Sequence, residues 1–440
     1  GISLQKIRIA LKNVSTLLGK NKNITDVSIF SDGTSIYVSE DDTIGDFNLN
    51  ASVDFHISLY GHLGSILIVN GEKNASYISD IQHVRRRETV SMTPSNALVA
   101  LRAFANASTL NSTAPDVTAH KDNVSTLLKD ITNTSITPLV ASSGLSIQYA
   151  IMMGLVNEAQ DKHPNKPIKF IVPPNCYGGT NDQARRVAAC LDNVEVVDLP
   201  VDGENDMVSS IDKVLTTIAS QDAVPYIIAE IPTNPRVEVP DLQNLKAVLS
   251  KQRQTPNGDT AIDPVFILDQ TFCPNVHFLG EEDILATVRT ISYASGSKFP
   301  SGGKCTAGYC VANNKAKALM PNIALHLSLC DNEATAQQYE ILAAQLPSML
   351  QRIKDAYVNT REFVTFIKET LPEAKLNFVS EDLANEGFTP SVFSLDLPTK
   401  GSTEEEREAY KRELNLKLIN LMITEIPNES KFCVSYGQLK

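Results

Sequence analysis

From about Val140 onward, near-continuous apolar segments alternate with helical ones, and this alternation constrains the fold more than any other feature of the chain. The apolar segments "IKFIVPP", "VEVVDLP", "PYIIAEIP" and "PVFILDQT" have the length and composition of buried strands. Amphipathic segments such as "NDQARRVAACL" and "DLQNLKAVLSKQ" separate them. Strands of this kind, separated by helices, predict an α/β fold with a mostly parallel sheet covered by helices on both faces.

Both ends of the chain differ from this central region. Residues 1–85 contain the alternating segments "DVSIFSDGTSIYVS" and "FHISLYGHLGSILIVNGEKN", which predict two strand pairs and so a β-rich N-terminal extension. From about Ala334 the chain has one long helical run, two short strand segments and a charged helix. Because 440 residues exceed what one compact core usually holds, we expect three parts: the extension at 1–85, an α/β domain at 86–332, and a smaller α+β C-terminal domain at 333–440.

The composition argues against two classes of partner. The net charge of -12 and the lack of basic runs disfavour a nucleic-acid surface, and no apolar run reaches membrane-spanning length. The seven cysteines include no CxxC pair, so they indicate free thiols in a reducing compartment rather than a disulfide framework or a zinc site. From the cysteine pattern we expect no metal site. No secretory leader precedes "GISLQKIRIALKNV", and we therefore expect a cytoplasmic protein.

The candidate site follows from where the parallel strands end, because in such sheets the ligand lies beyond the carboxyl ends of the strands. Asp269 ends an apolar strand, where a carboxylate is costly unless it meets a cation, and Tyr177 and Asn234 follow two other strands. Ser143 and Gly144 begin a helix, whose free N–H groups favour a phosphate. Each residue alone also fits an ordinary role, as a turn cap, a core tyrosine or a common helix start.

Two lysines, Lys298 and Lys304, lie in the Gly- and Ser-rich segment "SYASGSKFPSGGKCTAG". This segment does not match a phosphate-binding P-loop. Lys298 occupies the position of the motif's first glycine, and Cys305 occupies the position of its hydroxyl residue. Lys298 instead follows a strand among hydroxyl residues, a position that suits a Schiff base to an aldehyde whose phosphate is held nearby. An exposed loop lysine is the alternative interpretation.

In their order along the chain, these segments resemble those of a known family. The blocks "SSGL", "CYGGT", "EIPTNP", "VPDL", "LDQTFCPN" and "SGSKFPSGG" are similar to those of the cystathionine γ-synthase family, the Cys/Met-metabolism pyridoxal-phosphate enzymes of fold type I. The resemblance covers roughly residues 89–422 and implies a large domain built on a seven-stranded sheet. It also implies pyridoxal 5'-phosphate as the cofactor and a homo-oligomer, a dimer of dimers, whose sites are shared between subunits.

The resemblance implies a role for each candidate residue. Lys298 would form the Schiff base with pyridoxal phosphate, Asp269 would keep its pyridine nitrogen protonated, and Tyr177 would stack on the ring and assist the leaving group. Asn234 would lie by the ring hydroxyl. The phosphate would be held by five residues: Ser143, Gly144, Leu145, Ser295 and Ser297. Lys304 matches no role of the family, and we interpret it as a surface charge or a charge near the phosphate.

The sequence departs from the family in three places. The Tyr-x-Arg pair that reaches a neighbouring subunit's phosphate is replaced by "QHVRRRETV", in which Arg87 is the candidate. The position expected for an arginine that binds the substrate carboxylate is either missing or, in "KFCVSYG", taken by Cys433, so either the sequence is a fragment or carboxylate binding differs. Residues 1–85 have no counterpart that aligns.

By this resemblance we expect an enzyme that acts at the β or γ carbon of an amino-acid substrate, either a sulfur amino acid or an O-activated homoserine. γ-Replacement of the cystathionine γ-synthase type comes first, because "YGGT" resembles that branch, and β- or γ-lyase or sulfhydrylase activity is the alternative. A degenerate member that binds pyridoxal phosphate without turnover, and an aminotransferase on the same fold, are further hypotheses.

Overall fold

The computed structural model describes residues 26–31, 34–39, 44–46, 55–60, 64–79, 81–82, 94–106, 117–201, 205–330 and 332–430. Its main body is a seven-stranded sheet in the order β6-β12-β11-β10-β9-β7-β8. The strands are β6 (Leu139–Ala141), β7 (Ile168–Val172), β8 (Val194–Asp198), β9 (Val224–Glu230), β10 (Val265–Asp269), β11 (Thr290–Ser295) and β12 (Gly308–Ala312). All run in one direction except β12, which is antiparallel to both neighbours. The predicted mostly parallel sheet is thus confirmed.

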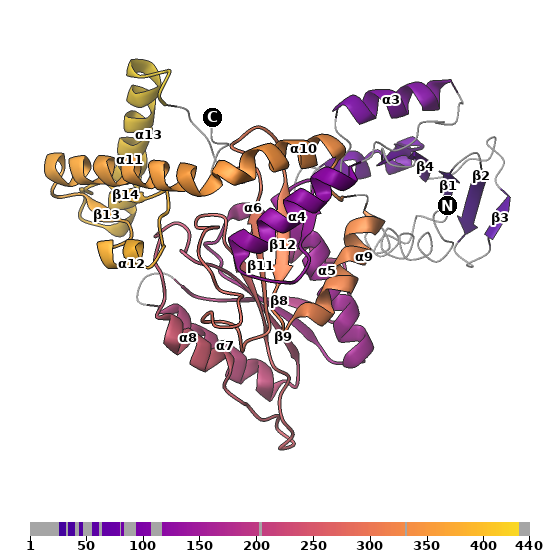
Figure 1. The fold of residues 1–440 in the computed structure, drawn as a ribbon, viewed down its shortest axis with the longest axis horizontal. Coiled ribbons are helices and arrows are strands. Elements are labelled where there is room, and N and C mark those ends of the chain that lie inside the picture. The colour runs from indigo at the N-terminus through magenta and orange to yellow at the C-terminus, as the bar shows by residue number, and fades with distance from the viewer. Residues whose placement is uncertain are drawn as a thin grey trace.

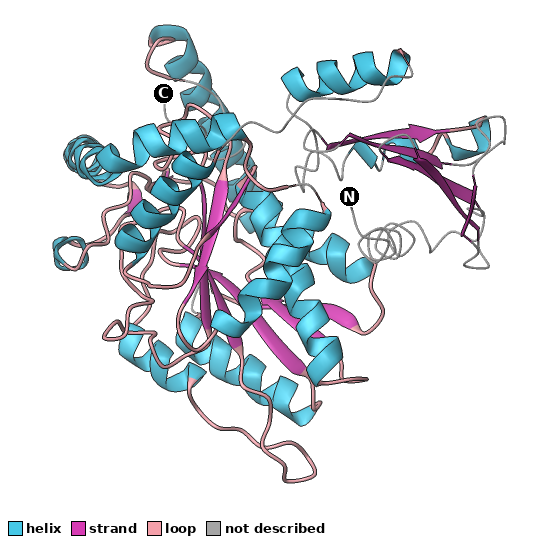
Figure 2. Cartoon of the chain, turned by 45° about the vertical axis from the view of Figure 1, so that its right-hand side comes forward, coloured by secondary structure: helices cyan, strands magenta, loops and turns pink. Residues whose placement is uncertain are grey.

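Helices cover both faces of this sheet, as Figure 1 and Figure 2 show. One face packs against α5 (Gly144–Lys162), α6 (Gly178–Ala189) and α9 (Met320–Leu329). The other face packs against α7 (Met207–Ser220) and α8 (Leu242–Leu249). Every residue of β7, β9 and β10 is buried, which explains why their segments are apolar without alternation.

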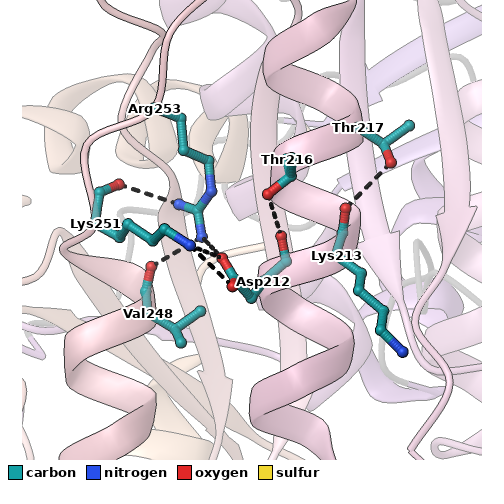
Figure 3. Close-up of polar contacts among 7 residues, drawn as sticks. All are labelled: Asp212, Lys213, Thr216, Thr217, Val248, Lys251 and Arg253. Carbon is teal, nitrogen blue, oxygen red and sulfur yellow. Dashed lines mark hydrogen bonds and ion pairs between the residues drawn. The ribbon is translucent and has the colours of Figure 1, made fainter.

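A cluster of ion pairs joins α7 to the segment that follows α8 (Figure 3). Asp212 on α7 accepts hydrogen bonds from the ammonium of Lys251 at 3.0 Å and from the guanidinium of Arg253 at 2.6 Å, and both of these residues follow α8. These hydrogen bonds hold the pKa of Asp212 below its usual value. Arg253 lies between α8 and β10, so the cluster is part of the connection that leads into β10. The candidate site residues instead lie at or after the carboxyl ends of strands.

The order of the strands reverses once between two parallel neighbours. β7 is followed along the chain by β8 on its outer side, whereas β9 is followed by β10, β11 and β12 on its other side. The connections leaving the carboxyl ends of β7 and β9 therefore diverge, and this is the usual ligand position in open α/β sheets. Tyr177 follows β7 and Asn234 follows β9, so two candidate residues flank this point.

The C-terminal part differs from the prediction in one respect. The single long helix expected there is wrong: α10 (Ala336–Gln345) and α11 (Met349–Thr370) are separated by the 3-10 turn η3 (Leu346–Ser348). Pro347 lies in that turn, and α10 ends there because proline has no N–H to continue the hydrogen bonds of the helix. The short strands and the charged helix are present as β13 (Lys375–Asn377), β14 (Ser394–Asp396) and α13 (Glu404–Glu425), with α12 (Glu381–Asn385) between the two strands.

The N-terminal strands form a five-stranded sheet of their own, in the order β3-β2-β1-β4-β5. They are β1 (Asp26–Ser31), β2 (Thr34–Ser39), β3 (Ile44–Asp46), β4 (Phe55–Tyr60) and β5 (Gly64–Val69). The predicted pairs are confirmed, since β1 with β2 and β4 with β5 are antiparallel. The remaining elements are η1 (Glu72–Asn74), α3 (Pro94–Ala105), α4 (Thr118–Thr132) and η2 (Lys317–Leu319). The division into three domains stays a prediction.

None of the helices in the described part of the chain combines the length and the apolar character that spanning a bilayer requires.

Candidate functional site

All the predicted site residues that the structure describes line one cavity of about 200 Å³. The cavity lies at the carboxyl ends of β7, β9, β10 and β11, where the strand order reverses. The predicted residues on its wall are Ser143, Gly144, Leu145, Tyr177, Asn234, Asp269, Ser295, Ser297 and Lys298. The remaining candidate, Arg87, lies outside the described residues. Five separate segments of the sequence thus meet at a single place.

The start of α5 forms one wall of the cavity. Ser143 caps this helix, since its Oγ accepts a hydrogen bond from the N–H of Ser146 at 3.0 Å. Gly144 packs tightly against Ser295, because a Cβ at position 144 would lie 3.0 Å from the Ser295 Cβ. The first N–H groups of a helix have no acceptor within it and, together with the helix dipole, favour an anion. The hydroxyls of Ser143, Ser295 and Ser297 also line the cavity, so the start of α5 and the turn after β11 can together hold a phosphate.

Of the two lysines in the Gly- and Ser-rich segment, Lys298 lines the cavity and Lys304 does not. Lys298 lies in the turn after β11 and is half-buried, and its ammonium is 3.4 Å from the Oγ of Ser295. Lys304 is exposed. Arg352 on α11 braces the turn, because its guanidinium donates to the carbonyl of Phe299 at 2.6 Å. The C-terminal part of the chain therefore helps to fix where Lys298 lies.

Two buried carboxyls lie side by side at the end of the sheet. Asp269 ends β10 and Glu230 ends β9, and the two residues are paired in register. The Oδ1 of Asp269 accepts hydrogen bonds from the N–H of Thr271 at 2.9 Å and from its hydroxyl at 2.6 Å. Burial raises the pKa of both carboxyls, that of Glu230 to about 8, and the neighbouring Asp269 adds to the rise at Glu230. Such a pair holds a proton unless a cation lies against it, so this wall suits a positively charged group.

Tyr177 is positioned by its backbone and by a glycine. Its N–H donates to the Oε1 of Glu230 at 2.8 Å, which ties the start of α6 to the end of β9. Its ring lies against Gly179, because a Cβ there would lie 2.5 Å from the ring carbon Cε1. By contrast, nothing lies within 4 Å of a Cβ built at Gly178. The second glycine of "YGG" therefore makes room for the tyrosine ring at the cavity wall.

Gly179→Ala is expected to lower the free energy of unfolding by roughly 1–3 kcal/mol, because the new methyl group must displace the Tyr177 ring. Gly178→Ala is the matched control and should be neutral or slightly stabilising, since its Cβ meets open space and alanine favours the helix. Denaturant unfolding of both variants measures the difference. Equal stabilities would show that the ring does not lie where the structure places it.

Asn234 reaches the cavity from the turn that follows β9. It lies between Pro232 and Pro235, and the peptide bonds before both prolines are cis. Its backbone N–H is a second donor to the carboxyl of Glu230, beside that of Tyr177. Glu230 thus joins the two segments that flank the reversal point of the sheet.

Several residues of the cavity are not predicted by the sequence patterns: Gln148, Thr180, Glu230, Pro232, Thr271, Phe272, Tyr293 and Thr306. Glu230 carried a usable signal, because it is an acid at the end of an apolar strand, as Asp269 is. Tyr293 and Gln148 carried none, since one lies inside a strand and the other inside a helix. Within the described ranges, no group of three His, Cys, Asp or Glu side chains is arranged to hold a metal ion.

Comparison with known proteins gives matches to solved structures alone. No protein-family model matches the chain, and no curated protein matches it. MetB from Corynebacterium glutamicum matches at 15% identity with a TM-score of 0.47, over 65% of this chain and 68% of that one. Cystathionine γ-lyase from Lactobacillus plantarum, complexed with L-serine, matches at 19% identity and 0.47, over 63% and 66%. Cystathionine γ-lyase from yeast matches at 17% identity and 0.48, over 64% and 66%.

These solved structures are of the kind of enzyme that the sequence blocks resemble, and the chain spans about two thirds of each of them. Identities and TM-scores this low carry no argument about activity. The function is therefore argued from the site.

Proposed function

We propose that the protein is a pyridoxal-phosphate enzyme of the transsulfuration type, acting at the β or γ carbon of a sulfur amino acid or an O-activated homoserine. The observation that carries the proposal is the convergence of Lys298, Asp269 and the start of α5 on one cavity. An aldehyde needs an amine, a pyridine nitrogen needs an acid, and a phosphate needs N–H and hydroxyl donors. The cavity wall offers all three kinds of group.

The residues present fit this cofactor. The buried acid pair, Asp269 and Glu230, suits the positive charge of a protonated ring nitrogen. The helix start at Ser143 suits the negative charge of the phosphate. The contact between Gly144 and Ser295 leaves no room for a side chain, so it keeps the two elements that would share the phosphate close together.

When bound, pyridoxal phosphate supplies an electron sink for negative charge that develops at the substrate's α carbon. Asp269 would keep a proton on the ring nitrogen, and the two donors of Thr271 hold its carboxylate in place. The amine of Lys298, near the hydroxyl of Ser295, would take a proton from one substrate carbon and return it to another. Tyr177 lies on the wall of this cavity, where its ring would contact the bound cofactor. These are the tasks that elimination and replacement at the β or γ carbon share.

Within this class, γ-replacement of the cystathionine γ-synthase type is the first candidate, and β- or γ-elimination and sulfhydrylation are the alternatives. Product analysis separates them, because replacement yields cystathionine or another thioether, whereas elimination yields an α-keto acid and ammonia. A transaminated acceptor would indicate an aminotransferase. The homo-oligomer and the cytoplasmic location expected from the sequence stay predictions.

The absorbance of the purified protein with added pyridoxal phosphate tests the proposal. We expect a yellow band, and after borohydride reduction a pyridoxyl group on the peptide that carries Lys298. A protein that stays colourless would contradict the proposal. A coloured protein that forms no product from sulfur amino acids or O-activated homoserines would support a member of the class that binds the cofactor without turnover.

A further inference from the structure

Three polar side chains lie in one row across the main sheet. Glu230 on β9 is paired in register with Asp269 on β10, and Asp269 is paired in register with Tyr293 on β11. Because side chains alternate between the two faces of a strand, register partners project to the same face. All three line the cavity and are at most 9% exposed. The acid pair is therefore continued by a buried phenol.

The single O–H of Tyr293 faces two possible hydrogen-bond acceptors. Its O–H donates to the Oε1 of Gln148 on α5 at 3.1 Å. The second acceptor is the carboxyl of Asp269, its register partner on the same face of the sheet, whose pKa this phenol helps to lower against the effect of burial. Burial raises the pKa of Tyr293, and the charge of Asp269 raises it further, so the phenol keeps its proton. A phenol carries one proton and donates it to one acceptor at a time, so Gln148 and Asp269 compete for it.

We propose that Tyr293 is a positioning residue that holds Asp269 as an anion, by donating its O–H to Asp269 when this carboxyl gives up its proton and to Gln148 otherwise. The Nε2 of Gln148 is anchored to the carbonyl of Thr180 at 3.3 Å, so the amide is fixed as the resting acceptor. A hydrogen bond donated to a carboxylate favours its charged form, and the phenol thus adds to the two donors of Thr271. The inference rests on the proposed function only for the identity of the cation that Asp269 meets.

Tyr293→Phe removes the hydroxyl and keeps the ring that fills the core. Burial raises the pKa of Asp269 above its value in the unfolded chain, so its contribution to stability is present at low pH and is lost as the pH rises. Without the phenol this pKa rises further. The melting temperature of the ligand-free variant should therefore fall below that of the wild type by an amount that widens from about pH 5.5 to about pH 8.5.

Gln148→Met gives a test of opposite sign. It removes the competing acceptor with little change in volume, so the phenol is left to donate to Asp269 alone. This lowers the pKa of Asp269. The difference by which Gln148→Met melts below the wild type should therefore narrow as the pH rises. A tyrosine that only fills the core would not produce opposite trends in the two variants.

Tyr226→Phe is the matched control. Tyr226 is equally buried, on β9, and its phenol donates to the carbonyl of Leu155 at 2.9 Å and to the Oε2 of Glu158 at 3.3 Å. Although burial opposes it, the hydrogen bond from Lys162 holds the pKa of Glu158 below its usual value, so this carboxylate stays ionised over the range. The melting-temperature deficit of Tyr226→Phe relative to the wild type should therefore be constant. Other groups that face Asp269 are Glu230, Lys298, Cys176 and Tyr309. Burial raises the pKa of Cys176 and of Tyr309, so neither ionises between these pH values, and all four groups are present in every variant compared.

The affinity for pyridoxal phosphate gives a second readout. At about pH 8, Tyr293→Phe should weaken it roughly tenfold, the size of one hydrogen bond to a charged group, and Tyr226→Phe should leave it unchanged. A Tyr293→Phe deficit that is constant with pH, or a Gln148→Met trend of the same sign, overturns the inference. If the wild type binds no pyridoxal phosphate, the proposed function fails, yet the ligand-free measurements still decide the role of Tyr293.

Discussion

Lys298→Ala should abolish covalent attachment of pyridoxal phosphate and lower turnover by about a thousandfold, whereas Lys304→Ala should change neither. The two lysines lie in the same Gly- and Ser-rich segment, but Lys298 lines the cavity with its ammonium near Ser295, and Lys304 is exposed. Removing Lys298 takes away both the amine that would react with the aldehyde and the base that would move the proton. Removing Lys304 takes away a solvated charge.

Borohydride reduction followed by peptide mapping measures attachment in both variants, and substrate consumption at saturating pyridoxal phosphate measures turnover. Circular dichroism checks that each variant is folded, so that loss of attachment is not loss of structure. Attachment that disappears in Lys304→Ala and persists in Lys298→Ala would reverse the assignment. It would also require the segment after β11 to lie differently against the cavity.

The main sheet and most of the candidate site follow from the sequence for one physical reason. Strands covered on both faces must be apolar throughout, so a polar residue at the end of such a run is conspicuous. Asp269 and Lys298 stand out in this way, and a parallel sheet brings their strand ends to the same edge. Glu230 stands out for the same reason, and a stricter use of the rule would have included it.

What the sequence does not predict depends on pairing between distant segments. Tyr293 is an ordinary strand residue until β11 is paired in register with β10, and Gln148 is an ordinary helical residue until α5 packs on the sheet. The role of Gly179 appears only when the Tyr177 ring is placed against it. The break at Pro347 is different, because proline was visible in the sequence and the helical periodicity on both sides of it concealed the interruption.

Asp269→Asn should lower turnover by about a thousandfold while the protein still binds pyridoxal phosphate. The amide has the size of the carboxyl and its oxygen can still accept from Thr271, so the cavity should keep its shape. It carries no negative charge, however, and cannot keep a proton on the ring nitrogen, so the electron sink is lost. The matched control is Asp198→Asn, because Asp198 also ends a strand of this sheet but is exposed and paired with Arg185 at 2.6 Å. Steady-state turnover and the cofactor absorbance of both variants measure the effect.

Glu230 lies beside Asp269, so either acid could face the ring nitrogen of the cofactor. Turnover measurements on a Glu230 variant and on Asp269→Asn distinguish the two. Glu230 accepts from the backbone N–H groups of Tyr177 and Asn234, and burial raises its pKa to about 8, so at neutral pH it is mainly a protonated brace between two segments. Asp269 has the donors of Thr271 and the nearby charge of Lys298, which favour its anion once a cation lies against it. Glu230→Gln should therefore keep turnover within roughly tenfold of the wild type, since an amide oxygen still accepts both N–H groups. If Glu230→Gln were the inactive variant and Asp269→Asn the active one, Glu230 would be the partner of the ring nitrogen.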